Sequence, residues 1–474
     1  MASGTLGEAA EALGASLLAG HPAGIWNGAA IDSRAVKGGE VFFALAGTQT
    51  DGHRFVGDAL ARGAAAAVVA ETPDPLPPTG AVLLVPDTQE ALHALARSVR
   101  RRLPERLAGI TGSAGKTTTK ELLAALLGAC FRVARNPGNF NNLIGFPLSL
   151  LNVPEGSEWM VAEMGMSTPG ELHQLSLLGR PDVALFTVVR PVHLEFFGTL
   201  QAIAEAKAEL LAGLAPDGLV VANADDPEVV RIVRRHQQGS PGVRTVWYGI
   251  HQPADVRARD LAPAPAGEVG SRFVLEAGGA SVDIALPLHG LYNVENFLAA
   301  AACAHALGLS LAEIAGAVAG VRPAAGRGVV HRLAGGLTVI DDSYNSNPDA
   351  AAKALAGAAA LAGAERRWTV LGDMLELGPE GPRFHRELGE EAARLGFAPV
   401  VGVGELSREL VAGAESRGAE AAWFPDAAAA ADWARGTARP GDLVLVKGSR
   451  GVHLEAVVRG LLAAATPEQP GESA

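Results

Sequence analysis

Short apolar runs alternate with amphipathic stretches along much of this 474-residue chain, most regularly between residues 107 and 222. Each run of four or five apolar residues is followed by a turn and then by apolar positions three and four residues apart, the spacing of an amphipathic helix. A strand–helix–strand order of this kind predicts a parallel sheet with helices on its faces. The strands are expected at 107–111, 159–163, 183–187 and 219–222, and the helices at 117–129, 169–178 and 201–213.

The first hundred residues predict a smaller α/β unit. Two short apolar runs, 40–44 and 66–70, have the composition of buried strands, and a helix is expected between them at 55–62. A second helix over 91–102 must end before Pro104, which cannot continue it. This break marks the first expected domain boundary.

A second boundary is expected near residue 323. A hairpin-like pair of strands at 272–276 and 281–286 and two helices at 293–307 and 310–320 precede Pro323, which suggests a hinge. We therefore expect an α/β protein of three domains. They are a small N-terminal α/β domain over 1–103, a central doubly wound domain with a phosphate-binding loop over 104–323, and a C-terminal Rossmann-like domain over 324–474.

The last of these segments again alternates strands with helices. It lacks the G-x-G-x-x-G fingerprint, so no dinucleotide is assigned to it. Its strands are expected near 337–341, 368–371, 399–403 and 443–446, and its helices are expected to begin near Pro348, Phe384, Leu406 and Ala427.

Composition narrows the classes of function. Hydrophobic residues make up 48% and charged residues 19% of the chain, as in globular proteins. The net charge of −12 and the lack of a basic cluster interleaved with aromatics argue against nucleic-acid binding. The N-terminus has no signal-peptide pattern and no apolar run suits an integral membrane segment, so we expect a cytoplasmic protein. Cys130 and Cys303 are interpreted as small core residues.

The most informative motif is the loop T-G-S-A-G-K-T-T, which joins the first expected strand of the central domain to its first helix. A glycine-rich turn lets backbone N–H groups converge on phosphate oxygens, a lysine adds positive charge, and a threonine hydroxyl can bind Mg²⁺. The motif is two residues shorter than G-x-x-x-x-G-K-[ST], whose first glycine would fall at Ile110. An accidental turn is the alternative, but strand, loop and helix follow in the required order. We assign phosphate binding to Thr111, Gly112, Ser113, Ala114, Gly115, Lys116, Thr117 and Thr118.

Lys207 is a second candidate, on a helix expected over 200–214. Its neighbours three and four positions away are alanine, isoleucine and leucine, so its amine lies on the apolar face. A buried lysine needs a partner or a lowered pKa, and a neutral amine can react with CO₂ to form a carbamate, an anion that can bind a cation. The alternative is a lysine that extends its amine to solvent, and helix position alone favours that alternative.

Two further candidates follow strands of the central domain. Glu163 ends one apolar run, and His193 lies shortly after the next. In a doubly wound sheet such positions line the ligand crevice, and a phosphate-bound Mg²⁺ favours a carboxylate partner. Taken singly, each is more often a satisfied polar residue at a strand end; together with the phosphate loop they favour a metal site.

Polar side chains also gather in two loops. The segment N-P-G-N-F-N-N at 136–142 holds four asparagines in seven residues, and it either faces a site or forms an elaborate turn. The segment D-D-S-Y-N-S-N-P at 341–348 follows a strand and opens a helix, with Asn347 as the cap and Pro348 at the first position. Capping does not account for the polar residues from Asp341 to Asn345.

Together these motifs resemble the ATP-dependent Mur ligases of peptidoglycan synthesis, and the similarity covers almost the whole chain. Within that family, the segments DDSYNSNP, LGDMLELG and KGSR are similar to the member that adds the last building block, the dipeptide D-alanyl-D-alanine. The resemblance rests on TGSAGKTT at 111–118, NPGNFNNLIGFPLSLL at 136–151, the Glu163-Met164-Gly165 turn, His193-Leu194-Glu195 before Phe197-Gly198, Lys207, and Asn223-Ala224-Asp225-Asp226.

The resemblance implies ATP and Mg²⁺ as ligands of the central domain. It places the β- and γ-phosphates at Lys116, one Mg²⁺ at Thr117 and Glu163, and a second Mg²⁺ at His193 and a Lys207 carbamate. The family's H-N-x-x-N motif has Tyr292 instead of histidine here, which affects a local contact only. The remaining ATP contacts that it implies are Asn293, Asn296 for adenine, Arg327 for phosphate and Asp342 for ribose.

The resemblance also implies small-molecule substrates and a monomeric enzyme. The UDP-N-acetylmuramoyl-tripeptide would be held at its uridine end by the first domain, and D-alanyl-D-alanine by the third. The γ-phosphoryl group of ATP would pass to the tripeptide carboxylate, and the dipeptide amine would attack the acyl phosphate. The implied substrate contacts are Ser33, Arg34, Gly47, Asp51, His53, Asn139, Asn142, Tyr344, Asn345 and Asn347.

Other functions are less well supported by the motifs. The preceding ligase, which adds a diamino acid to the UDP-linked dipeptide, is expected to carry an acidic-Asn-Pro-Arg element that this chain lacks. A folylpolyglutamate synthase is more distant. A P-loop ATPase acting as a motor would have the full Walker spacing, and a nucleotide-binding protein without catalysis would release no phosphate.

Overall fold

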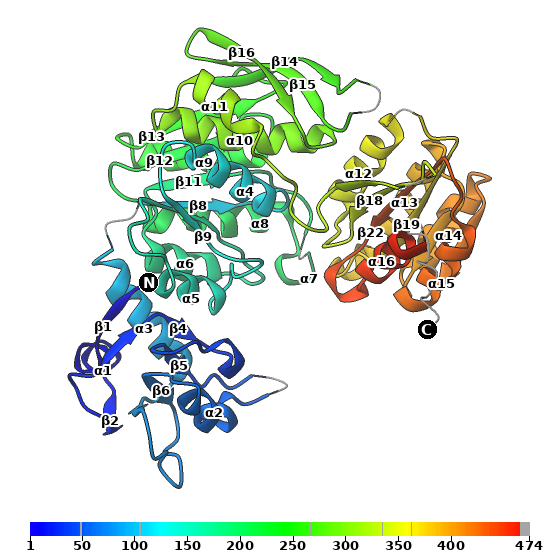
Figure 1. Ribbon diagram of the computed structural model, residues 1–474. Helices are drawn as coiled ribbons and strands as arrows, with labels where there is room; N and C mark the ends of the chain where they lie inside the picture. Colours follow the sequence, from blue (N-terminus) through cyan, green and yellow to red (C-terminus); the bar gives the residue numbers. More distant parts are fainter. Residues whose placement is uncertain are drawn as a thin grey trace, which may run out of the picture.

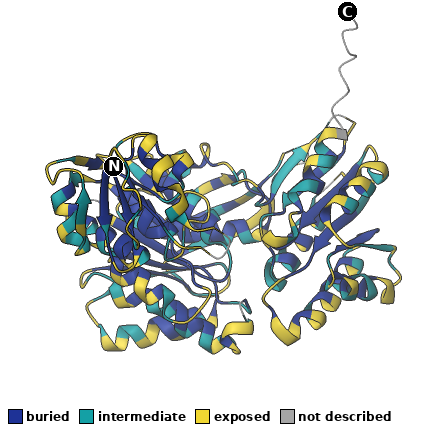
Figure 2. Ribbon diagram, turned by 90° about the horizontal axis from the view of Figure 1, so that it is seen from below, coloured by how far each residue is buried: buried dark blue, intermediate teal, exposed yellow. Residues whose placement is uncertain are grey.

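The computed structural model describes residues 1–47, 50–103, 106–192, 194–265, 268–333, 335–361 and 363–464. These residues form three α/β domains in chain order, each built on its own sheet, as Figure 1 shows. In that view the first domain lies below the second, and the third lies to one side of the second. Figure 2 shows buried strands in the interior and helices whose outer faces are exposed.

The first domain has a five-stranded sheet in the order β2-β7-β6-β5-β4, in which β2 alone runs antiparallel to its neighbour. A separate antiparallel pair joins β1 to β3. Its strands are β1 (Ser3–Thr5), β2 (Ser16–Ala19), β3 (Ile25–Asn27), β4 (Ala29–Ala30), β5 (Val41–Phe43), β6 (Ala66–Val69) and β7 (Ala81–Leu84); its helices are α1 (Leu6–Leu13), α2 (Val56–Ala61) and α3 (Thr88–Arg100), with 3-10 turns η1 (Ser33–Ala35) and η2 (Gly52–Phe55).

The second domain has a nine-stranded sheet in the order β16-β15-β14-β13-β12-β11-β8-β10-β9. The strands from β9 to β14 are parallel, and β15 and β16 add an antiparallel hairpin at one edge. The strands are β8 (Arg106–Thr111), β9 (Val133–Arg135), β10 (Trp159–Glu163), β11 (Val183–Phe186), β12 (Leu219–Asn223), β13 (Arg244–Gly249), β14 (Val256–Pro263), β15 (Ser271–Ala277) and β16 (Ala280–Leu286); the helices are α4 (Lys116–Leu127), α5 (Gly145–Leu151), α6 (Glu171–Gly179), α7 (Leu194–Phe197), α8 (Leu200–Ala208), η3 (Glu209–Gly213), α9 (Pro227–Gly239), α10 (Leu291–Ala306) and α11 (Leu311–Val318).

The third domain has a six-stranded sheet in the order β17-β18-β22-β19-β20-β21, with only β17 antiparallel. Helices pack on both faces, so the central strands are apolar throughout. The strands are β17 (Val329–Arg332), β18 (Thr338–Asp342), β19 (Arg366–Gly372), β20 (Val400–Val403), β21 (Ala421–Phe424) and β22 (Asp442–Lys447); the helices are α12 (Pro348–Ala360), η4 (Gly378–Glu380), α13 (Gly381–Arg394), α14 (Ser407–Ser416), α15 (Ala427–Thr437), η5 (Arg450–Val452) and α16 (Glu455–Ala464).

The central strands of the second domain carry apolar side chains on both faces because each face is covered. In β8, Leu107 belongs to the apolar cluster on one face, whereas Ala108 and Ile110 belong to the cluster on the other, which α4 and α10 cover. The first of these clusters continues without a break through α5 and α3 into the first domain. The first two domains therefore share one apolar core.

Most of the expected elements are present, with ends shifted by one to three residues. The expectation omitted several elements in all three domains, such as β7, α5 and α16, and also β13, β14 and α9, which lie between residues 224 and 271. The helix α9 does carry a start signal, since Asp226 caps it and Pro227 opens it. The interpretation of Cys130 as a core residue is wrong: its thiol is exposed beyond the end of α4, whereas Cys303 is buried as expected.

Polar contacts reinforce the joint between the first two domains. The Asn152 side chain, just after α5, accepts a hydrogen bond from Ala29 N (3.1 Å) and donates one to Ala29 O (2.9 Å). It thereby pairs with the edge strand β4 as a further strand would. Ala2 N also donates to Leu151 O (3.1 Å). Among the described residues, no helix is long and apolar enough to cross a membrane.

We predict that Asn152→Ala loosens this joint. The change leaves both backbone groups of Ala29 without their partner, which costs about 1–3 kcal/mol for buried polar groups. Hydrogen–deuterium exchange should show faster exchange in β4 and in the residues that follow α5, with little change in the third domain. Gln238→Ala, which removes an exposed amide, serves as the control. Unchanged protection of β4 would show that the shared apolar core alone holds the joint.

Candidate active site

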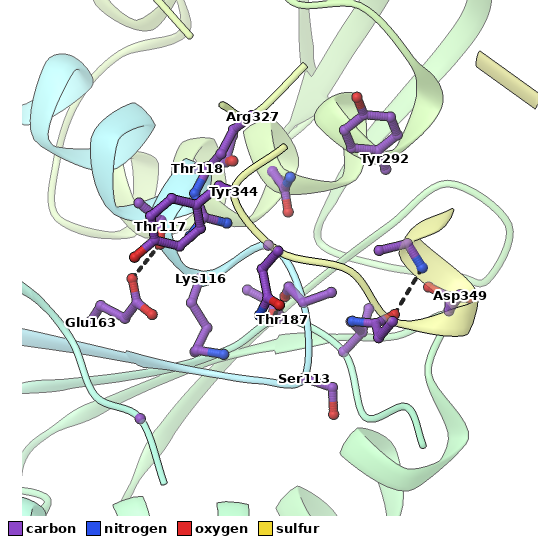
Figure 3. A pocket seen from close by; sticks show the side chains of 18 of the residues that line it. Ser113, Lys116, Thr117, Thr118, Glu163, Thr187, Tyr292, Arg327, Tyr344 and Asp349 are labelled. Carbon is purple, nitrogen blue, oxygen red and sulfur yellow. Dashed lines mark hydrogen bonds between the residues drawn. The ribbon is translucent and has the colours of Figure 1, made fainter. Parts of the chain in front are cut away.

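A cavity of about 370 Å³ opens between the second and third domains, and Figure 3 shows many of its side chains. Its walls come from the loops after β8, β10, β11 and β12, from the start of α10, and from the loops around β18 and β22. These are the carboxyl ends of parallel strands, where ligands bind in open α/β sheets. The predicted residues that line it are Ser113, Ala114, Gly115, Lys116, Thr117, Thr118, Asn139, Asn142, Glu163, Asn296, Arg327, Asp342, Tyr344, Asn345 and Asn347.

The loop after β8 forms a cradle that only glycine permits. Gly115 precedes α4 with φ of +81°, and a Cβ there would lie 2.1 Å from Asn296 Oδ1. A Cβ on Gly112 would lie 1.8 Å from Thr187 Oγ1. No side chain caps α4, so the free N–H groups of its first turn are available to an anion. Thr111 lies outside the cavity, and its buried hydroxyl has no hydrogen-bond partner among the described residues.

Lys116 begins α4 and lies in the wall of the cavity. Its Nζ donates to Gly112 O (2.9 Å), so the amine curls back over its own loop. Burial lowers the pKa of this amine, the carboxylate of Glu163 opposes that effect, and Arg327 adds to it. The net result is a lowered pKa of Lys116, so binding of an anion nearby would favour its charged form.

Glu163, at the end of β10, presents a fixed carboxylate beside the loop. One oxygen accepts from Thr117 Oγ1 (2.5 Å) and the other from Asn141 Nδ2 (2.7 Å), and Figure 3 shows the first of these bonds. Burial raises the pKa of Glu163, but Lys116, both hydrogen bonds and Arg327 together hold it below its usual value. An ionised carboxylate beside a hydroxyl is a set of hard oxygen donors that fits Mg²⁺.

Of the second predicted pair of Mg²⁺ ligands, His193 and Lys207, the structure describes only Lys207. His193 lies outside the described residues. Lys207, on α8, is 3% exposed, and burial together with the charge of Lys116 places its pKa well below the usual value. It does not line the cavity, and the described residues hold no group of three or more His, Cys, Asp or Glu side chains arranged for a metal. The solvent-exposed alternative for Lys207 is therefore wrong, because the residue is buried.

The residues expected to contact the nucleoside of ATP come from α10 and from the third domain. Asn296 accepts from Thr119 Oγ1 (3.4 Å) and lines the cavity, whereas Asn293 lies behind it and donates to His289 O (2.7 Å). From the third domain, Asp342 is paired with Lys447 (2.7 Å). Burial raises the pKa of Asp342 despite this ion pair.

Tyr344 lines the cavity and has two cations near its ring. The Arg327 guanidinium lies 4.2 Å from the centre of its ring, an arrangement visible in Figure 3, and that of Arg450 lies 5.5 Å away. Tyr292, which replaces the histidine of the family motif, also lines the cavity. Two positive groups therefore lie near the ring of Tyr344 in the wall of the cavity.

Ion pairs hold the second and third domains in this arrangement. Arg190 contacts Asp226 (2.5 Å) in its own domain and Asp349 (3.1 Å) at the start of α12. Lys353 of α12 contacts Glu295 of α10 (2.8 Å). These pairs join the domains beside the phosphate loop, to which Arg190 N is bonded through the Ser113 hydroxyl (2.9 Å).

The residues expected to hold uridine form a separate group in the first domain, and none of them lines the cavity. Arg34 is paired with Asp32 (2.7 Å), next to the buried Ser33. His53 accepts at Nε2 from Ala70 N (2.9 Å), so its Nδ1 carries the proton that it donates to Asp51 (2.7 Å). Gly47 N donates to Thr50 O (3.0 Å), beside two residues outside the described chain.

Comparison with known proteins agrees with this arrangement. Three family models match the chain: the Mur ligase family catalytic domain at 26–100, the Mur ligase middle domain at 110–304 and the Mur ligase glutamate ligase domain at 326–450. A relative from Bacillus subtilis, named UDP-N-acetylmuramoyl-tripeptide–D-alanyl-D-alanine ligase, is 35% identical over 92% of this chain and 93% of its own.

The chain belongs to the Mur ligase family. Among solved structures, MurF from Acinetobacter baumannii is similar with a TM-score of 0.86 and 29% identity, over 98% of this chain and 99% of that one. MurF from Thermotoga maritima, solved with ADP, has a TM-score of 0.79 and 28% identity, over 93% and 98% of the two chains. The agreement extends over all three domains.

Within this Mur ligase, the asparagine loop at 136–142 supports Glu163. Asn136 is buried, and its side chain bonds both backbone groups of Glu163 (3.0 Å each). Lys120, one turn beyond Lys116 on α4 and 0% exposed, donates to Asn136 O (2.7 Å). Asn142 caps the start of α5 by accepting from Gly145 N (2.8 Å). The loop is therefore a support for the site as well as part of its wall.

Several residues of this site escaped sequence reasoning. Asn141 and Lys120 lie within segments that the pattern did mark, but their burial depends on how two loops fold together. Lys447 and Arg450 belong to K-G-S-R, which directly follows an apolar strand, the position that identified Glu163. Applying that signal to the third domain would have found them.

We predict that Lys120→Met weakens both the fold around the loop and ATP binding. The substitution preserves length but leaves Asn136 O without its donor, at a cost of about 1–3 kcal/mol in the free energy of unfolding. Thermal unfolding and calorimetric titration with a non-hydrolysable ATP analogue measure the two effects. Arg135→Met is the control, since Arg135 is an exposed member of the same charge network through Glu121. Equal effects of the two variants would contradict a specific support.

Proposed function

We propose that this chain is an ATP-dependent amide ligase that joins D-alanyl-D-alanine to UDP-N-acetylmuramoyl-tripeptide, with release of ADP and phosphate. The observation that carries the proposal is similarity over more than nine-tenths of both chains to a relative named for this reaction. The cavity between the second and third domains supports it, because it combines a phosphate cradle with a polar wall from another domain. The need for ATP favours the cytoplasm as its location, and we propose that the enzyme acts as a monomer.

In this proposal each of the three domains binds part of the substrates or of ATP. The domain over residues 1–103 binds the uridine end of the nucleotide substrate through Ser33, Arg34, Gly47, Asp51 and His53. The domain over 104–323 binds ATP, and that over 324–474 binds the dipeptide and the far side of ATP. The proposed ATP contacts are the loop from Thr111 to Thr118 with Lys116 on the β- and γ-phosphates, Asn293 and Asn296 at adenine, Arg327 at phosphate and Asp342 at ribose; the further substrate contacts are Asn139, Asn142, Tyr344, Asn345 and Asn347.

The chemistry begins with a carboxylate that is a poor electrophile. Transfer of the γ-phosphoryl group breaks the bond between Pγ and the bridging oxygen, forms a bond from phosphorus to a carboxylate oxygen, and leaves ADP. The dipeptide amine then attacks the acyl carbon, loses a proton, and expels phosphate. Lys116 and the N–H groups of α4 stabilise charge on the transferring group. Enclosure between two domains excludes water from the acyl phosphate.

Metal ions have a place in this proposal at two pairs of residues. Thr117 and Glu163 would hold one Mg²⁺, and His193 with a carbamate on Lys207 would hold another. Bound Mg²⁺ supplies charge neutralisation at the phosphates. The contribution of the chain is to keep Glu163 ionised and oriented, through Thr117, Asn141 and the nearby charge of Lys116.

The preceding ligase, which adds a diamino acid to the UDP-linked dipeptide, is not favoured. A solved ligase for 2,6-diaminopimelate matches with a TM-score of 0.54 and 23% identity, which is a likeness of fold alone. The MurF structures match more closely on both measures.

The proposed function predicts phosphate release only when ATP, the UDP-linked tripeptide and D-alanyl-D-alanine are all present. Omitting each in turn measures this dependence, and phosphate release from ATP alone would contradict it.

Lys116→Ala should lower turnover on the order of 10²–10³-fold, because one preorganised charge at the transferring group is lost. Arg234→Ala, on the exposed face of α9, is the control, and unchanged thermal unfolding would show that Lys116→Ala is folded.

We predict that Lys207→Ala is nearly inactive and that short carboxylic acids partly restore turnover. An acid such as formate or acetate can enter the vacated space and supply the oxygens of the carbamate. A lysine acting as an ammonium would be replaced by small amines instead. Recovery with methylamine but not with formate would contradict the carbamate.

Carbon-13 NMR tests the carbamate without turnover. After equilibration with ¹³CO₂, the wild type should show a carbamate resonance that Lys207→Ala lacks and that the exposed-lysine control Lys37→Ala keeps. Persistence of the resonance in Lys207→Ala would place the carbamate on another amine.

A further inference from the structure

The third domain must recognise both ends of a dipeptide if the proposed function holds, and the inference below rests on that function. The amine of D-alanyl-D-alanine has to reach the acyl phosphate beside the phosphate loop. The carboxylate at the other end is a fixed negative charge that needs a cation when it leaves water. The cavity should therefore contain a positive side chain that ATP does not use and that the protein holds only loosely.

Five cationic side chains line the cavity in the described part of the chain, and four of them are engaged. Lys116 belongs to the phosphate loop, and Arg327 stacks on Tyr344 at 4.2 Å on the proposed phosphate side. The other two form ion pairs: Lys353 with Glu295 (2.8 Å) and Lys447 with Asp342 (2.7 Å).

Arg450 is the fifth cation, and it differs from the rest. Its ion pair with Glu455 is long, at 3.6 Å, and its side chain is 61% exposed, so its guanidinium is the least tightly held of the five. It lies in η5, directly after β22, and so at the carboxyl end of a central parallel strand. The planar fork of an arginine suits two-point binding of a carboxylate.

The position of Arg450 suits the length of the substrate. Its guanidinium lies 5.5 Å from the ring of Tyr344, while that of Arg327 lies 4.2 Å from the same ring. The two guanidinium carbons are therefore at most about 10 Å apart (4.2 Å plus 5.5 Å), and two extended residues cover roughly 7 Å. A dipeptide whose amine points toward the phosphate side can therefore place its carboxylate at Arg450.

An apolar side chain lies next to this cation. Leu375 is 44% exposed, and its backbone N–H is held by the Ser449 hydroxyl (3.0 Å). A Cβ on Gly451 would lie 3.1 Å from Leu375 Cδ1, so the leucine lies against the segment that carries Arg450. A methyl-bearing, negatively charged dipeptide end matches such a surface.

We propose that Arg450 binds the C-terminal carboxylate of D-alanyl-D-alanine and determines the requirement of the enzyme for a charged dipeptide end. The residue is a substrate-binding group and takes no part in phosphoryl transfer. Its contribution should vanish for a dipeptide whose carboxylate is replaced by a neutral amide.

The test compares kcat/KM for D-alanyl-D-alanine and for D-alanyl-D-alaninamide in the wild type and in Arg450→Met. The wild type should prefer the acid by about 10–100-fold, the value of a charge-assisted hydrogen bond. Arg450→Met should lose that factor with the acid and change little with the amide, so the preference falls to about threefold or less. The KM for ATP should stay unchanged, and Arg450→Lys should keep part of the preference.

Arg408→Met is the matched control, because Arg408 is an exposed arginine of the same domain that stacks on Trp423 at 3.5 Å, away from the cavity lining. It should keep the wild-type preference. Retention of the preference in folded Arg450→Met, or a rise only in the KM for ATP, would overturn the assignment. Absence of turnover with the dipeptide in the wild type would instead refute the proposed function, and the inference with it.

Discussion

The buried carboxylate of Glu163 is the interaction on which the rest of the site depends. A carboxylate removed from water must be compensated, and here both oxygens accept hydrogen bonds while Lys116 supplies a nearby charge. Those donors come from α4 and from the asparagine loop, so satisfying one acid fixes two segments relative to β10. Lys120 then joins these two segments to each other through Asn136. These hydrogen bonds hold the start of α4, and with it the phosphate-binding loop, in place relative to Glu163.

Most of the fold could be predicted from the sequence because parallel strands buried on both faces form continuous apolar runs, and the helices between them keep their period. Only some of the elements that escaped prediction have weak patterns. The strand β14 has only two buried residues in eight, since it carries charged side chains and ends in an exposed stretch. The helix α9 offered two signals that the prediction missed, a capped start and buried Val229, Ile232 and Val233 at helical spacing.

The residues of the site also divide into those that the sequence could predict and those that it could not. Residues at the ends of strands, such as Glu163, and the glycine loop could be predicted because local chemistry demands them. Lys120 and Arg190 could not, because their roles depend on contacts between segments far apart in the chain. The helical face of Lys207 marked it as a candidate but favoured a solvent-exposed amine, and only the packed structure shows that the residue is buried. The position of His193 lies outside the described residues.

The shared apolar core of the first two domains has a geometric consequence. Among the described residues, no buried apolar cluster spans the second and third domains, which are joined by partly exposed ion pairs instead. The first two domains instead form one continuous body. In the proposed function, a nucleotide anchored at its uridine end is thereby presented to the phosphate loop at a fixed reach. The fixed distance between the two sites would select the length of the peptide on the sugar. Only a peptide of suitable length would bring its terminal carboxylate to the transferring phosphoryl group.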